Sequence, residues 1–322
     1  MDVSQIADAV LSGDRRAVAR AISMVEDGAP ELAELSRSVF GQSGRAYTVG
    51  LTGSPGVGKS SLAEQLVRAA RARDRTVAVL AIDPTSPFTG GALLGDRLRM
   101  QAHATDPSVF IRSMATRGHL GGMALAAPEA IRILDASGKD LVIVETVGVG
   151  QAEVEVATTA DTTLVVVQPG WGDAVQAAKA GILEIADVFV VNKADREGAG
   201  EVVRELKSML RMGPRRAWEP PVIKTSTVNG DGLDDLWEAI DAHRAHLEES
   251  GELAARRRKR ILEEVEGIVA ERLRARTAGL LDGQAESALA DDLAERKVDP
   301  YRAAEILLDR VSGPSTPGES DG

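Results

Sequence analysis

A glycine-rich octapeptide constrains this chain more than any other stretch. It fits the phosphate-loop pattern G-x-x-x-x-G-K-[ST] at every fixed position: Gly53-Ser54-Pro55-Gly56-Val57-Gly58-Lys59-Ser60. In such a loop the glycines let backbone N–H groups surround a triphosphate, the lysine reaches the β- and γ-phosphate oxygens, and the serine hydroxyl binds Mg²⁺. The sequence therefore predicts a phosphate site, which we extend to the adjacent residue Ser61.

The flanks of the octapeptide meet the structural requirements of this motif. Residues 47–52 are typical of a buried strand, and residues 61–70 have the apolar spacing of a helix. A helix that begins at the loop directs its N-terminal dipole at the phosphates. Because the motif and its flanks agree independently, a chance glycine-rich turn is a poor alternative.

Short β-rich runs alternate with helical stretches between residues 45 and 248, the pattern of a parallel sheet covered by helices on both faces. The sequence thus predicts an α/β P-loop NTPase fold with a mostly parallel, doubly wound sheet. The expected strands are 47–52, 76–82, 109–114, 141–146, 163–168, 188–191 and 222–225. Ligands bind at the carboxyl ends of such strands, so the informative residues should follow these runs.

The remaining parts of the chain are predicted to be mainly helical. We expect a helical N-terminal extension, the P-loop core, a charged helical C-terminal arm and a disordered tail, at 1–44, 45–248, 249–311 and 312–322. The basic run 256–260 has acidic neighbours and is interpreted as a solvated helix face. His243 and His246 lack a third ligand nearby and are also assigned to solvent.

Acidic residues after the second and fourth strands are candidate magnesium ligands. Asp83 has an equally good alternative as a helix N-cap or turn residue before Pro84. Glu145 ends the fourth strand shortly before Gly148, whose backbone N–H can approach the γ-phosphate. Val149 stands where Ras-like enzymes carry the glutamine that orients water, so we expect slow unaided hydrolysis.

The tetrapeptide Asn192-Lys193-Ala194-Asp195 follows the sixth strand and indicates the base. Guanine presents two adjacent donors that one carboxylate can accept, whereas adenine presents an acceptor at N1. The lysine can lie along the purine face. Alone, N-K-x-D could be a helix cap, but at a strand end about 130 residues after a phosphate loop it favours GTP over ATP. We expect a second base contact at Ser226 and Thr227.

Composition argues against several classes of protein. The net charge of −11 over 322 residues argues against a general surface that binds nucleic acid or anionic membranes. With no cysteine, the chain has no disulfide, thiolate zinc site or iron–sulfur cluster. The absence of a signal-like start and of an 18-residue apolar run predicts a cytoplasmic protein without a membrane span.

Together, the motifs resemble those of the MeaB/MMAA (formerly ArgK) G-proteins, which are chaperones of the adenosylcobalamin-dependent methylmalonyl-CoA mutase. The shared stretches occur in the same order: 53–60, Asp83-Pro84-Thr85-Ser86, Glu145-Thr146-Val147-Gly148-Val149-Gly150-Gln151 and 192–195. The resemblance covers nearly the full chain, and the run 145–151 is its most specific part.

The resemblance implies roles for residues that spacing alone does not assign. The implied metal ligands are Ser60, Asp83, Asp96 and Glu145, and the implied catalytic residues are Lys59, Asp96, Arg99, Glu145 and Lys179. Lys179 belongs to a third switch, 170–181, which in relatives responds to the mutase. From spacing alone, a solvated helix face explains Arg99 as well as a switch role does, and Lys179 would be a solvated helix residue.

The function implied by the resemblance is that of a GTP-hydrolysing chaperone, with GTP/GDP and Mg²⁺ as cofactors. It would gate adenosylcobalamin loading and protection of methylmalonyl-CoA mutase or the related isobutyryl-CoA mutase, and it would form a homodimer through its arm. Two alternatives stay open. An ATP-dependent kinase of a transport system is disfavoured by Asp195, and a GTP-dependent metallochaperone should carry a Cys/His cluster.

Overall fold

The computed structural model describes residues 2–84, 103, 105–116, 122–146, 158–170, 184–281 and 284–312. The chain divides into two compact units, one up to Leu262 and one from Glu263 onward. The first unit contains the sheet and the predicted nucleotide site. No helix in the described ranges is long and apolar enough to cross a membrane.

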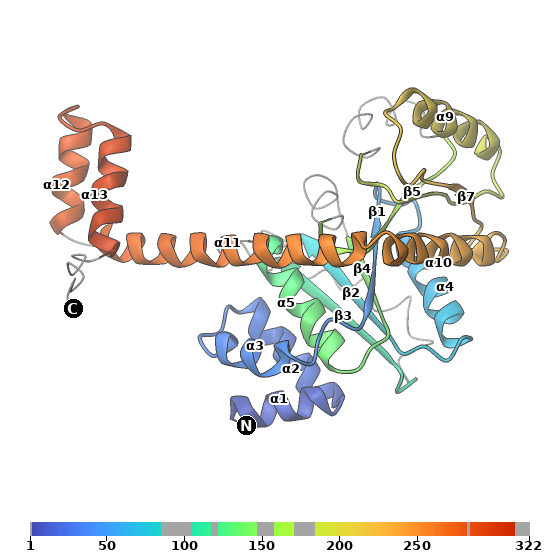
Figure 1. The fold of residues 1–322 in the computed structure, drawn as a ribbon, viewed down its shortest axis with the longest axis horizontal. Coiled ribbons are helices and arrows are strands. Elements are labelled where there is room, and N and C mark those ends of the chain that lie inside the picture. The colour runs from blue at the N-terminus through green and yellow to red at the C-terminus, as the bar shows by residue number, and fades with distance from the viewer. Residues whose placement is uncertain are drawn as a thin grey trace, which may run out of the picture. The chain divides into compact units, whose positions relative to one another are not determined.

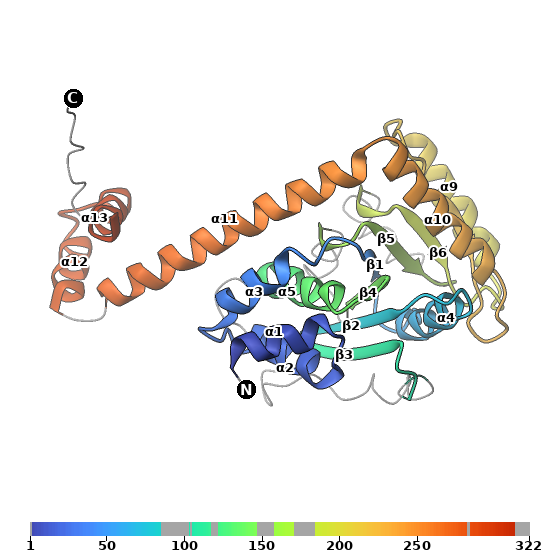
Figure 2. The ribbon, with the colours of Figure 1, turned by 60° about the horizontal axis from the view of Figure 1, so that its bottom comes forward.

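A parallel sheet of seven strands forms the centre of the first unit (Figures 1 and 2). Its strands are β1 (Tyr47–Thr52), β2 (Val77–Pro84), β3 (Val109–Thr116), β4 (Leu141–Thr146), β5 (Thr162–Val167), β6 (Val188–Val191) and β7 (Val222–Lys224). They lie in the order β3-β2-β4-β1-β5-β6-β7, and every pairing is parallel. The predicted P-loop NTPase fold is confirmed, and all seven expected strands are present. The loop after β1 therefore emerges between the ends of β4 and β5, where sheets of this kind bind ligands.

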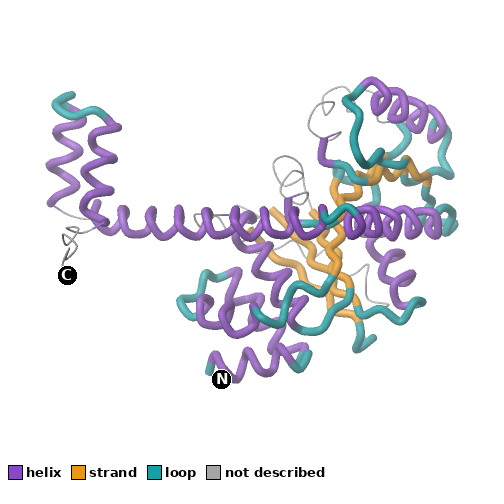
Figure 3. Tube along the Cα trace, in the orientation of Figure 1, coloured by secondary structure: helices purple, strands orange, loops and turns teal. Residues whose placement is uncertain are grey.

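Helices cover both faces of the sheet (Figure 3). On one face lie α4 (Lys59–Arg71) and α10 (Leu233–Glu249), and on the other lie α5 (Gly122–Ala136) and α9 (Ala199–Met212). β4 shows why helices are needed on both faces. Leu141 and Ile143 pack on the α4 and α10 side, and Val142 and Val144 pack on the α5 side. A strand that is apolar on both sides must be covered on both sides.

Three N-terminal helices pack on the α5 side of the sheet. They are α1 (Val3–Leu11), α2 (Arg15–Glu26) and α3 (Leu32–Phe40). Asp14 caps α2 by accepting the backbone N–H groups of Arg16 and Ala17. Fully buried side chains such as Ile22 and Leu35 join the same apolar cluster as α5 and β2. These helices are thus part of the first unit rather than a free extension.

The C-terminal region is helical, as expected, but its basic run is not a solvated face. It contains α11 (Glu252–Leu281), α12 (Gln284–Ala294) and α13 (Pro300–Ser312). Arg257 and Arg260 pair with Asp161, which is 1% exposed, and Arg256 pairs with Asp187. A buried carboxylate needs a counter-charge, and these partners lie too far apart in the sequence for local patterns to show the pairing.

The assignment of His243 to solvent is also wrong. Its side chain is fully buried on α10, where Nδ1 lies 2.8 Å from the hydroxyl of Thr162 and Nε2 lies 3.2 Å from Oδ1 of Asp187. Trp218 packs against the ring at a centroid distance of 4.9 Å. The polar partners that make burial of this imidazole tolerable come from β5 and the turn before β6, so a helical pattern could not reveal them.

We expect Asp161 to make the stability of the fold depend on pH in the acidic range. Burial alone would raise its pKa, but hydrogen bonds and charge from Arg257 and Arg260 outweigh burial and lower the pKa below its ordinary value. Such a carboxyl stabilises the fold above its unfolded pKa of about 4 and loses that contribution as pH falls through its native pKa. Asp161→Asn should cost about 3–5 kcal/mol at pH 7, because it leaves two guanidinium groups uncompensated.

Urea unfolding between pH 7 and pH 3 measures this contribution. The wild type should lose more stability over this range than Asp161→Asn, because only the wild type has a carboxyl at this position that must release its proton on folding once the pH falls below its unfolded pKa. Parallel stability curves for the two proteins would show that Asp161 carries no such linkage.

Candidate guanine-nucleotide site

The phosphate loop lies directly after β1, and its lysine is held inside the curve of the loop. Lys59 begins α4 and is 6% exposed. Its Nζ donates to the carbonyl of Gly53 at 2.5 Å and to that of Ser54 at 3.2 Å. The ammonium group is thereby held against the backbone of the loop that leads into α4. This arrangement concentrates positive charge at one point, as binding of a polyphosphate requires.

Two glycines of the loop stand where no side chain fits. Gly53 has φ +137°, and a Cβ there would lie 2.2 Å from the carbonyl oxygen of Val166 in β5. Gly58 has φ +97°, and a Cβ there would lie 2.4 Å from Nδ2 of Asn192. Gly53 lets the backbone turn out of β1 while it stays in close contact with β5. Gly58 lets the phosphate loop approach the segment after β6.

Replacement of Gly53 by alanine should destabilise the protein by about 3 kcal/mol, because it adds both a backbone strain and a clash with a strand. Thermal unfolding should show this as a clear drop in Tm. Gly200→Ala is the matched control, since a Cβ there would lie 3.7 Å from the nearest atom, the end of the Arg204 side chain. If both variants melt like the wild type, the close approach of Gly53 to β5 is not a constraint.

Ser60 and Glu145 bring two oxygen atoms that can bind a metal ion together at the end of β4. The Ser60 hydroxyl donates to Oε1 of Glu145 at 2.5 Å. Glu145 is 1% exposed and stands opposite Leu51 in the β1–β4 register. Hydroxyl and carboxylate oxygens are the ligands that Mg²⁺ prefers, so this pair fits a magnesium site next to the phosphate loop.

Asn192 ties the base-recognition loop to the phosphate loop. It is fully buried, its Nδ2 donates to the carbonyl of Val57 at 2.8 Å, and its Oδ1 accepts from the hydroxyl of Thr225 at 3.2 Å. The amide thereby connects the phosphate loop with the ends of β6 and β7. Asn192 holds together the three segments that would surround a nucleotide.

Lys193 spans the space between the same segments. Its Nζ donates to the carbonyl of Gly56 at 2.5 Å and to Oε1 of Gln168 at 2.6 Å. Its backbone has φ +56°, a conformation that non-glycine residues rarely adopt and that recurs at functional sites. Burial lowers the pKa of its amine from the ordinary value. Its aliphatic stem is therefore placed beside the phosphate loop, where a purine face can lie on it.

Asp195 is oriented by the loop after β7. The hydroxyl of Ser226 donates to its Oδ1 at 2.7 Å, and this hydrogen bond is the main reason that the pKa of Asp195 lies below its ordinary value. The carboxylate is therefore ionised and acts only as an acceptor at neutral pH. Thr227 lies next to Ser226, and its carbonyl accepts from Gln65 of α4 at 3.4 Å. Both base-recognition segments are thus anchored to the core.

Most of the predicted site residues come together at the carboxyl ends of the strands. These residues are Gly53, Ser54, Pro55, Gly56, Val57, Gly58, Lys59, Ser60, Ser61, Glu145, Asn192, Lys193, Asp195, Ser226 and Thr227. Asp83 stands near the end of β2, but its side chain lies outside the described part of the structure, as do Asp96, Arg99, Gly148 and Lys179. Two contacts were not predicted, that of Gln168 with Lys193 and that of Thr225 with Asn192. Gln168 and Thr225 are polar residues at strand ends, the only signal that the sequence offers for these contacts.

Comparison with known proteins gives the family. Residues 18–280 match the family model described as methylmalonyl Co-A mutase-associated GTPase MeaB. This chain belongs to the MeaB family. The resemblance inferred from the motifs is confirmed, and the protein is a GTPase of the MeaB/MMAA kind that binds guanine nucleotides.

Relatives of this MeaB-family chain match it over most of their length. A Pyrococcus abyssi protein named as a GTPase is 48% identical over 97% of each chain. GTPase ArgK of Escherichia coli is 37% identical over 78% of each chain. The methylmalonic aciduria type A homolog of Caenorhabditis elegans, a mitochondrial protein, is 36% identical over 80% of this chain and 69% of its own.

A solved structure supports the same fold. The crystal structure of a LAO/AO transport system kinase superposes with a TM-score of 0.70, with 25% identity over 97% of this chain and 98% of that one. Within the described residues of the MeaB-family chain, no group of three or more His, Cys, Asp or Glu side chains is arranged to hold a metal ion.

Proposed function

We propose that this MeaB-family GTPase gates adenosylcobalamin loading and protection of an acyl-CoA mutase, either methylmalonyl-CoA mutase or isobutyryl-CoA mutase. The observation that carries the proposal is the match of residues 18–280 to a family described by its association with methylmalonyl-CoA mutase. The name of the C. elegans relative refers to methylmalonic aciduria, which points to the same metabolic step.

The proposed reaction is in-line attack of water on the γ-phosphate of GTP, giving GDP and phosphate. Lys59 compensates the charge that develops on the phosphate oxygens, and the N-terminus of α4 orients them. Mg²⁺, when bound, neutralises further phosphate charge, and Ser60 and Glu145 are the described residues that would hold it. Asp83, Asp96, Arg99 and Lys179 complete the proposed site as metal ligands and switch residues.

The base is read by the two loops after β6 and β7. Asp195 accepts the N1–H and N2–H₂ donors of guanine, Lys193 lies along the purine face, and Ser226 and Thr227 border the base. Adenine presents an acceptor at N1 to the same carboxylate, and this repulsion favours GTP. The orientation of Asp195 by Ser226 supports this assignment.

Partner response and self-association belong to the same proposal. The third switch, 170–181, with Lys179, would transmit mutase binding to the site. Large apolar side chains are exposed along α11 and would form the homodimer contact: Ile261, Leu262, Val265, Ile268, Val269 and Leu273. A cytoplasmic location, where the mutase and GTP are both present, completes the proposed setting.

Phosphate release tests the proposal directly. The full chain is assayed with Mg²⁺ and either GTP or ATP, with and without a purified adenosylcobalamin-dependent acyl-CoA mutase. Slow GTP turnover that the mutase accelerates, and that Lys179→Ala no longer accelerates, is the expected result. A rate of GTP turnover that is the same with and without the mutase overturns the chaperone role. ATP-dependent phosphorylation of a protein supports the transport-kinase alternative.

A further inference from the structure

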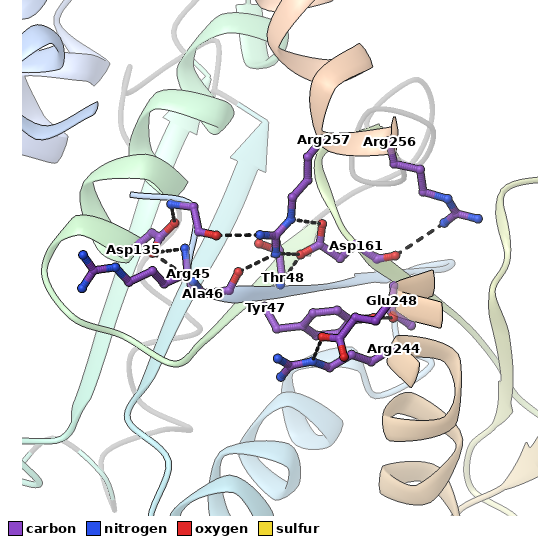
Figure 4. Close-up of polar contacts among 12 residues, drawn as sticks. Arg45, Ala46, Tyr47, Thr48, Asp135, Asp161, Arg244, Glu248, Arg256 and Arg257 are labelled. Atoms are coloured by element: carbon purple, nitrogen blue, oxygen red, sulfur yellow. Dashed lines mark hydrogen bonds and ion pairs between the residues drawn. The ribbon is translucent and has the colours of Figure 1, made fainter. Parts of the chain in front are cut away.

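A set of contacts joins α11 to the two strands that lead to the nucleotide site (Figure 4). Arg257 donates to Oδ2 of Asp161 at 2.6 Å and to Oδ1 at 3.2 Å, and Arg260 donates to the same carboxylate. Asp161 immediately precedes β5, and it also accepts the backbone N–H of Thr48 in β1 at 3.0 Å. We call Asp161, Arg257 and Arg260 the arm clasp.

The arm clasp also holds the backbone just before both strands. Arg257 donates to the carbonyls of Gly44 at 2.7 Å and Ala46 at 2.8 Å, directly ahead of β1. Arg260 donates to the carbonyl of Thr159 at 2.5 Å, directly ahead of β5. The two strands therefore begin at points that side chains of α11 fix.

The same two strands carry nucleotide-site residues at their other ends. β1 runs into the phosphate loop at Gly53, and β5 runs into Gln168, which accepts from Lys193 at 2.6 Å. At that end the strands are in such close contact that Gly53 leaves no room for a Cβ beside Val166. A shift of one strand relative to the other would therefore move the phosphate loop against the base-recognition loop.

We propose that Arg257 and Arg260 are positioning residues for guanine-nucleotide binding. Through Asp161 they set the relative position of β1 and β5, and with it the geometry between the phosphate loop and the Gln168–Lys193 contact. The inference rests on the proposed nucleotide site and deepens it, because it gives α11 a direct route to that site. Coupling between two sites is reciprocal, so bound nucleotide must in turn stabilise the first turns of α11.

Hydrogen–deuterium exchange on the full wild-type chain tests the reciprocal effect without any substitution. We compare backbone exchange in residues 256–262 with and without saturating GDP and Mg²⁺. GDP is expected to slow exchange there about fivefold, the lower end of typical coupling between sites. Unchanged exchange in a chain that demonstrably binds GDP would overturn the inference.

Arg260→Met tests the forward effect, that of α11 on nucleotide binding. In this variant Arg257 still pairs with Asp161, and methionine keeps an unbranched side chain at position 260. Its Kd for GDP should rise about fivefold to tenfold. Arg258→Met, which removes the same charge from an exposed position on the same helix, is the matched control and should bind GDP like the wild type. Arg260→Lys should recover part of the affinity, since it restores the charge without the second N–H donor.

The outcomes separate this inference from the proposed function. A purely structural role would lower the Tm of Arg260→Met and leave the Kd of the folded protein unchanged, which would refute the positioning role. If Arg260→Met does not fold, the exchange measurement on the wild type decides alone. If the wild type binds no GDP, the proposed site is wrong and this inference is lost with it. If the wild type and Arg260→Met bind GDP equally, only the positioning role is lost.

Discussion

Lys59→Met should reduce the rate of GTP hydrolysis by about a thousandfold, the upper range for loss of one preorganised donor to a developing negative charge. The ammonium of Lys59 lies within the phosphate loop, in hydrogen-bond contact with the carbonyls of Gly53 and Ser54, on a side chain that is 6% exposed. In that shielded position a charge interacts more strongly with phosphate oxygens than in water. Single-turnover phosphate release with Mg²⁺ measures the loss.

Two comparisons make the Lys59 result specific. Lys207→Met removes a lysine from the exposed face of α9 and should hydrolyse GTP like the wild type. Methionine keeps the apolar stem at position 59, so α4 should still form and the Tm should change little. Hydrolysis by Lys59→Met within tenfold of the wild-type rate would mean that the reacting phosphate does not lie in this loop.

Asp195→Asn should weaken GTP binding by about a hundredfold and make the protein prefer XTP. In the proposed site the wild-type carboxylate accepts two donors of guanine, and hydrogen bonds to a charged group contribute about 1.5–3 kcal/mol each. The amide of asparagine presents one acceptor and one donor, which match the N1–H and the C2 carbonyl of xanthine. Ser226 can still donate to the side-chain oxygen at this position, so the amide should keep the orientation of the carboxylate.

Competition binding with GTP, XTP and ATP measures this change of preference. Asp234→Asn, at an exposed acidic residue in the first turn of α10, is the control and should retain the preference of the wild type for GTP. An Asp195→Asn protein that still prefers GTP over XTP would show that another group reads the base. Equal affinity of the wild type for GTP and ATP would refute the assignment of the tetrapeptide 192–195 as a guanine motif.

Residues at strand ends show how far the sequence alone could define the nucleotide site. The phosphate loop and the tetrapeptide 192–195 were identified because their chemistry depends on neighbours in the sequence. Gln168 and Thr225 were not, although they bond to Lys193 and Asn192. Neither belongs to a motif, and each gains its role only when parallel strands bring distant ends side by side. Asp96, Arg99 and Lys179 remain predictions, since they lie outside the described residues.

The arm clasp shows where local patterns mislead. Charged residues at helical spacing with acidic neighbours indicate a solvated face, and the run 256–260 has that pattern. In the structure, Arg257 reaches a carboxylate 96 residues away. The helical period fixes which side chains share a face, but it does not show what that face meets.

The sequence by itself determined the strands of the sheet, the phosphate loop and the binding of guanine nucleotides, because apolar periodicity and short motifs are set by residues a few positions apart. Only the tertiary structure decided that Asn192 joins the two nucleotide loops, that His243 is buried, and that α11 holds the starts of β1 and β5. Each of these depends on buried polar groups, which need hydrogen-bond or charged partners because they are no longer solvated. The tertiary structure, rather than the local sequence, determines which residue is the partner.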